Sequence, residues 1–143
     1  MPDIRHVLYV KAPIDDVFSI VSTPDGLVRL WGAGAIVGRN ESLCLTSGVD
    51  AIEFIVRRTR NRVNVQWNCE GDNNEMGDTI VFSLAEAGSH TQVKFFHARW
   101  PRDTHEMTQW NTLWGAFLMR LKADVEGGSI AGHSAPGELI NQN

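Results

Sequence analysis

The sequence predicts an α+β fold in which a curved antiparallel sheet wraps around one long C-terminal helix. Three observations predict it: an amphipathic stretch from His105 to Gly127, a run of strand-like segments between Ser42 and Trp100, and two short helical segments after a single first strand. A helix that follows a series of antiparallel strands buries its apolar side on one face of their sheet. Because a strongly curved sheet leaves space beside such a helix, we expect a cavity between the two.

The stretch from His105 to Gly127 has the spacing of an α-helix. Its large apolar residues recur every three or four positions, which places them on one side. They are Trp110, Leu113, Trp114, Phe117, Leu118, Leu121 and Val125. The polar residues between them, Arg120 included, are expected to face water. Asp103 is predicted to be the N-cap, with Glu106 returning the hydrogen bond, and Gly127-Gly128 is predicted to be the left-handed stop.

The first third of the chain predicts one strand and two short helices. The segment Ile4–Lys11 is rich in β-branched and aromatic residues, which favours a strand. Pro13 suits the first position of a helix that continues to Val21, and Thr23-Pro24 predicts the cap and first turn of a second helix through Trp31. The glycines of the following segment, residues 32–38, indicate a loop or an irregular edge strand.

Five segments before the long helix alternate apolar and polar residues, as half-buried antiparallel strands do. They are Ser42–Ser47, Val49–Thr59, Val63–Glu70, Thr79–Leu84 and Thr91–Trp100. Arg60-Asn61-Arg62 is predicted to form a hairpin turn, and Gly71–Gly77 a polar loop. In the last strand, alternation places Arg99 on the same inner face as His97.

The strand from Val49 to Thr59 leaves one alternative open. If Phe54 points inward, as its alternation with Val56 favours, then Glu53 and Arg57 face water. In the opposite register, Glu53 and Arg57 would form a buried pair able to hold the polar head of a ligand.

Length and composition indicate a single soluble globular domain. With 143 residues, of which 43% are apolar and 21% charged, the chain is long enough to bury a core without disulfides. Cys44 and Cys69 are interpreted as thiols in a reducing compartment. We assign residues 1–128 to the domain and residues 129–143 to a flexible C-terminal tail, because the tail is small, polar and unpatterned.

Charge and hydropathy exclude several functional classes. A net charge of −4 without a basic stripe argues against binding to nucleic acid. No apolar run approaches the roughly 18 residues of a membrane span, so membrane insertion is not expected. Charges within the first residues argue against a signal peptide, and we expect a cytoplasmic protein.

Several short motifs resemble one family. Ala12-Pro13 before Val17-Phe18, and Thr23-Pro24-Asp25-Gly26-Leu27 with Trp31, are similar to its first helix and to its T-x-x-G-L-x-x-W-W segment. Ten further residues resemble its last strand and closing helix: Thr91, Val93, Phe95, His97, Trp114, Leu118, Leu121-Lys122, Glu126 and Gly128. The family is the START-like (SRPBCC) superfamily, in the branch resembling the C-terminal domain of the activator of the heat-shock-ninety ATPase (Aha-type).

The resemblance covers Ile4 to Gly128 and implies a helix-grip fold. Two features depart from the usual pattern of the branch. Leu30 stands where the first of two tryptophans is usual, and the segment Gly32–Ser42 is shorter. Both departures lie where the entrance of a cavity is expected.

The aromatic residues of the predicted inner faces are candidate ligand-binding residues. The set comprises Phe54, Trp67, Phe82, Phe95, His97, Trp110, Trp114, Phe117 and Leu118. They are equally consistent with a ligand pocket and with core packing. His97 is interpreted first as a core histidine bonded to backbone, and second as a residue that orients a ligand or acts in acid–base catalysis.

We therefore expect a protein that binds a small hydrophobic or amphipathic molecule between the sheet and the long helix. Two other hypotheses remain: a cyclase- or lyase-type enzyme with His97 as acid–base group, and a co-chaperone-like interaction with a heat-shock ATPase. Homodimerisation through a sheet edge is left open. No catalytic constellation is visible, and no metal or cofactor is expected, since the five histidines lack ligand-like spacing.

Overall fold

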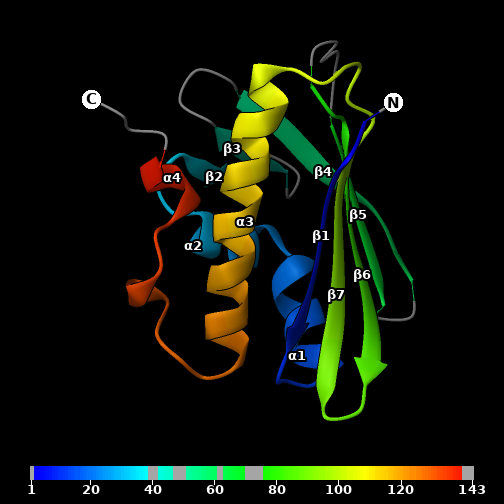
Figure 1. Cartoon of the computed structure of the whole chain (residues 1–143), viewed down its shortest axis with the longest axis vertical. Helices are drawn as coiled ribbons and strands as arrows, with labels where there is room; N and C mark the ends of the chain where they lie inside the picture. The colour runs from blue at the N-terminus through cyan, green and yellow to red at the C-terminus, as the bar shows by residue number, and fades with distance from the viewer. Residues whose placement is uncertain (1, 39–41, 47–50, 61–62, 70–75, 140–143) are drawn as a thin grey trace.

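The structure, a computed structural model, describes residues 2–38, 42–46, 51–60, 63–69 and 76–139, with the side chains of 51–53 and 55–60 left aside. It consists of an antiparallel sheet, the long helix α3 (His105–Val125) lying along one face of that sheet, and shorter helices around α3 (Figure 1). The predicted α+β architecture is confirmed.

The sheet has seven strands in the order β1-β7-β6-β5-β4-β3-β2, and every neighbouring pair is antiparallel. The strands are β1 (Ile4–Val10), β2 (Ala35–Val37), β3 (Leu43–Thr46), β4 (Ala51–Arg60), β5 (Asn64–Cys69), β6 (Thr79–Ala87) and β7 (His90–Ala98). Phe54 is fully buried, as its alternation predicts. The predicted turn at Arg60–Arg62 and the predicted loop at Gly71–Gly77 fall largely outside the described residues.

Two short helices, α1 (Ile14–Val21) and α2 (Pro24–Trp31), follow β1. The Thr23 side chain accepts a hydrogen bond from the Gly26 N–H, and Pro24 occupies the first turn of α2, so the predicted cap is confirmed. Pro13 is the N-cap of α1 and not its first helical residue. The difference is one position, because the extended backbone of Pro13 suits a cap.

The cap of α3 differs from the prediction. Thr104, and not Asp103, is the N-cap: its hydroxyl accepts a hydrogen bond of 3.2 Å from the Met107 N–H. Either residue type favours this position, so the sequence did not distinguish between the two neighbours. At the other end, Gly127 has a positive φ of 83° and Gly128 N–H donates to Ala123 O, which confirms the glycine stop.

The tail packs against the domain as far as the structure describes it. A 3₁₀ turn, η2 (Ile130–Gly132), and a short helix, α4 (Pro136–Leu139), lie beside α3 and α2 (Figure 1). Ala135, Pro136 and Gly137 are buried. A side chain at Gly137 would collide with the backbone of Ala33, so glycine allows this close approach. The tail is expected to be loosely draped, whereas in the structure the small residues Ala135 and Gly137 are buried in tight packing.

The first strand is joined to the end of the chain. β1 pairs with β7 along its whole length, from Ile4 opposite His97 to Val10 opposite Thr91. The Lys11 N–H donates to the Glu126 carboxylate at 2.8 Å, across a sequence separation of 115 residues. The Lys122 ammonium donates to Tyr9 O at 2.9 Å. These contacts fix the C-terminal end of α3 to the end of β1.

Candidate functional site

The nine candidate ligand-binding residues all lie in the interior, between the sheet and α3. None of them is more than 2% exposed. The β-strands contribute Phe54, Trp67, Phe82, Phe95 and His97, and α3 contributes Trp110, Trp114, Phe117 and Leu118. The alternation in the strands and the spacing in the helix therefore identified the buried faces correctly.

Most of these side chains form one aromatic cluster around Trp114. Its ring centroid lies 4.6 Å from Phe95 and 5.4 Å from Phe117, and Phe95 lies 5.2 Å from Phe82. Such distances are typical of directly packed rings. Trp67 lies apart from the cluster: its indole N–H donates to Val21 O at 3.0 Å and so links the sheet to α1.

Two tryptophans that the alternation did not select complete the cluster. Trp31, at the end of α2, lies 5.1 Å from Trp114 and 5.6 Å from Trp110. Trp100 follows β7 and lies 4.9 Å from His97. Both are fully buried.

Arg99 explains why Trp100 was missed. Alternation predicted that Arg99 faces inward, which is wrong: its side chain is 64% exposed and pairs with Asp78 at 3.0 Å. β7 ends at Ala98, and Arg99 has a positive φ of 70°, which turns the chain so that Trp100 points into the core. A positive φ is uncommon for a residue other than glycine, and the residues around Arg99 do not predict it.

His97 is fully buried and uses both ring nitrogens. Nε2 donates to Gly77 O at 2.8 Å, and Nδ1 accepts from the Trp114 indole N–H at 3.0 Å. Burial lowers the pKa of His97 from 6.5 to about 4, while the Gly77 carbonyl opposes this shift. His97 is therefore a neutral imidazole that joins β7, Gly77 and α3, which is the arrangement of a satisfied core histidine.

Three other indole N–H groups of the interior lack an acceptor in the part of the chain that the structure describes. They belong to Trp31, Trp100 and Trp110. A buried donor without a partner costs roughly 1–3 kcal/mol, and native interiors contain few of them. Together with His97, these three donors are polar groups of an otherwise apolar cluster.

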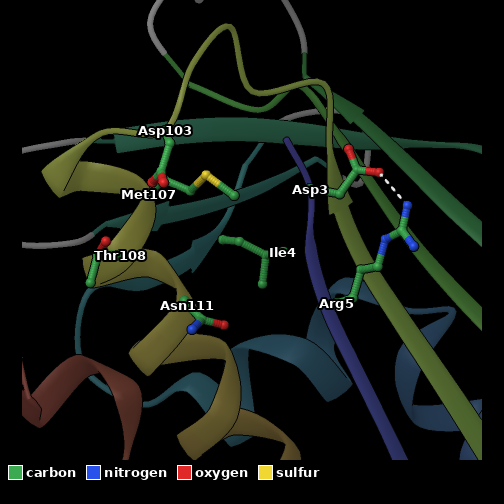
Figure 2. Close-up of a pocket in the computed structure, with 7 residues that line it drawn as sticks. All are labelled: Asp3, Ile4, Arg5, Asp103, Met107, Thr108 and Asn111. Carbon is green, nitrogen blue, oxygen red and sulfur yellow. Dashed lines mark hydrogen bonds and ion pairs between the residues drawn. The ribbon is translucent and has the colours of Figure 1, made fainter. Parts of the chain in front are cut away.

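A hollow of about 330 Å³ opens between the start of β1 and the first turns of α3 (Figure 2). It is lined by Asp3, Ile4, Arg5, Asp103, Met107, Thr108 and Asn111. Ile4 and Met107 lie between strand and helix and provide its apolar surface (Figure 2). Asn111 is held in place by the His6 ring, which donates from Nε2 at 2.9 Å.

The hollow lies next to the aromatic cluster. Ile4 is paired with His97 in the sheet, and Met107 precedes Trp110 by about one turn of α3. Two further hollows open at the protein surface, one at the C-terminal tail and one at the start of α1. None of the nine candidate residues lines any of these three hollows, so their role in binding stays a prediction.

Within the described ranges, no three His, Cys, Asp or Glu side chains gather in a way that would hold a metal ion. The helices that the structure describes include none with the length and apolarity to cross a membrane.

A curved antiparallel sheet closed over a long helix, with an aromatic interior and two short helices after the first strand, defines a START-like helix-grip protein. A model of the family described as Activator of Hsp90 ATPase homolog 1-like protein matches residues 11–126. The chain belongs to this family.

Solved structures from several bacteria are similar to this chain. The Aha1 dimer from Colwellia psychrerythraea is 28% identical, with 90% of this chain and 99% of that chain covered and a TM-score of 0.75. A protein from Bacillus halodurans is 20% identical (88% and 98% covered, TM-score 0.65), and CalU16 from Micromonospora echinospora is 17% identical (98% and 81% covered, TM-score 0.65). The last two share the fold alone. No curated protein sequence matches this chain.

Proposed function

We propose that this protein binds a small amphipathic molecule between β1 and α3. The hollow beside the aromatic cluster carries the proposal: its volume of about 330 Å³ lies in the range of small-molecule sites. Apolar groups of the ligand would lie against Ile4 and Met107. Its polar groups would bond to Thr108 and Asn111 at the rim.

The aromatic cluster next to the hollow supports this proposal. Its rings pack directly against one another and leave no room between them. A ligand that reaches them from the hollow would therefore have to displace a side chain that lines the hollow. Met107 suits such displacement, because methionine is unbranched and flexible. A ligand with acceptor oxygens would also supply partners for indole N–H groups that have none among the described residues.

His97 does not favour the acid–base hypothesis. Both of its ring nitrogens are hydrogen-bonded to protein groups, and His97 is not among the residues that line the hollow. A proton transfer from this ring would require the loss of one of these hydrogen bonds.

Met107 provides the test. With cis-parinaric acid as a fluorescent fatty-acid probe, we expect Met107→Trp to fill the hollow and weaken binding at least about tenfold, which corresponds to about 1.4 kcal/mol. The control is Met119→Ala, which truncates a methionine that lies on the same helix and is 44% exposed. It should bind as the wild type does.

Fluorescence titration measures the dissociation constants, and native mass spectrometry of freshly purified protein shows any retained molecule. The proposal is wrong if the wild type ignores the probe and a panel of other apolar acids and alcohols. It is also wrong if Met107→Trp binds as tightly as the wild type.

A second candidate function is an interaction with a heat-shock ATPase, with the protein acting as a homodimer. The family description and the dimeric relative suggest it. In addition, β1 is an edge strand, and Val7 and Tyr9 on its outer face are 58% and 49% exposed. Exposed apolar residues on an edge strand favour pairing with a second chain.

We expect the wild type to sediment as a dimer and Val7→Lys as a monomer at the same concentration, because the lysine places a charge on the edge strand. Met119→Lys adds the same charge on α3 and should leave the dimer intact. A monomeric wild type in sedimentation velocity would contradict the dimer, and failure to co-purify with the ATPase would contradict the partner.

A further inference from the structure

Arg120 lies on the side of α3 covered by the C-terminal tail. Its spacing in the helix predicts exposure, but the structure shows that only 8% of its surface is accessible. The prediction fails because η2 and α4 pack over this side of α3 (Figure 1). Arg120 follows Asn111 by two and a half helical turns, so the tail side of α3 is opposite the hollow at β1.

Among the described residues, the Arg120 guanidinium makes a hydrogen bond through one of its nitrogens. Nη1 donates to His133 O at 2.9 Å, which fixes the tail to the helix. Nε is buried and has no acceptor among the described residues. A guanidinium stays charged at every physiological pH and offers five donors, so a buried one requires acceptors and a counter-charge.

A hollow of about 500 Å³ adjoins this side chain. It is lined by Arg120, Ile130, Ala131, Gly132, His133, Ser134 and Glu138. Glu138 is the carboxylate of this lining, yet it makes no ion pair with Arg120 in the described part of the chain. The hollow thus combines a buried cation that has no ion pair among the described residues with a hydroxyl, an imidazole and the Glu138 carboxylate.

We infer that this hollow binds an oxyanion group, a carboxylate or a phosphate, of a small molecule. The planar guanidinium suits such a group because two parallel N–H donors match two oxygens of the anion. Ser134 provides a further donor at the wall. The volume accommodates a molecule larger than the anionic group itself. This site is separate from the proposed site at Met107.

The test uses inorganic phosphate, acetate and hexanoate, each titrated into the full-length protein at constant ionic strength and followed by ¹H–¹⁵N NMR spectra. We expect saturable shifts of the amides of residues 131–134 and of the Arg120 Nε–H resonance. Arg120→Gln should abolish these shifts, while Lys94→Gln, which removes an exposed cation on β7, should leave them unchanged.

The choice of anion identifies the ligand class. Saturation by phosphate alone assigns a phosphate, saturation by acetate and hexanoate assigns a carboxylate, and tighter binding of hexanoate shows that the hollow also accepts an apolar chain. Unsaturable shifts, or shifts that persist in Arg120→Gln, overturn the inference. If Arg120→Gln does not fold, a wild-type Arg120 Nε–H resonance that none of the three anions moves is sufficient to overturn it.

Discussion

Replacing Trp114 with alanine is expected to cost about 5 kcal/mol of the free energy of unfolding. Truncation of a buried aromatic side chain costs roughly 3–5 kcal/mol, and it leaves His97 Nδ1 without its donor, which adds about 1–3 kcal/mol. A domain of this size has only about 5–15 kcal/mol in total. Urea denaturation at pH 7, followed by circular dichroism, measures the change.

Trp114→Phe separates the two contributions to this loss. It keeps an aromatic ring against Phe95 and Phe117 but removes the indole donor. We expect an intermediate loss of roughly 2 kcal/mol, set by the unpaired His97 nitrogen. A Trp114→Ala variant that loses less than about 1 kcal/mol would show that the cluster is not packed as described.

The stability of the protein is expected to fall as the pH decreases from about 6.5 to about 4, in part because of His97. The unfolded chain binds a proton at this residue near pH 6.5, whereas burial lowers the pKa in the folded state to about 4. In this interval the unfolded state carries the extra proton, so acid favours unfolding. The free energy of unfolding falls by about 3 kcal/mol because of His97, and this loss is nearly complete at pH 4.

Urea titrations between pH 4 and pH 7 test this dependence, with His97→Gln as the control. Glutamine offers a donor for Gly77 O and an acceptor for the Trp114 N–H, but it does not titrate. Carboxylates contribute equally to both proteins, so the difference between their slopes reports His97. Parallel curves for the two proteins would rule out a buried neutral imidazole at this position.

The sequence predicted the architecture because its periodic signals are strong. Apolar residues at intervals of three and four identified α3, and alternation identified the buried faces of β5, β6 and β7. The cap at Thr23 was also predictable, because threonine followed by proline favours one conformation. These features depend on residues close together in the sequence.

The main errors concern features that the local pattern of residues does not determine. Arg120 is buried because the tail covers it, and nothing near position 120 indicates this cover. Trp100 turns inward because Arg99 adopts a positive φ, which breaks the alternation. Likewise, the hollow at β1 depends on the juxtaposition of Ile4 with Met107, so the sequence indicated the aromatic interior but not where its rim opens.

The pairing of β1 with β7 has a consequence for the synthesis of this protein. The first strand finds its partner only after β7 has been made, and Lys11 finds Glu126 later still. Contacts between such distant residues slow folding, because a long loop must close before they form. Most of the chain has therefore been synthesised before β1 is paired, and during that interval the unpaired edge of the strand is open to aggregation.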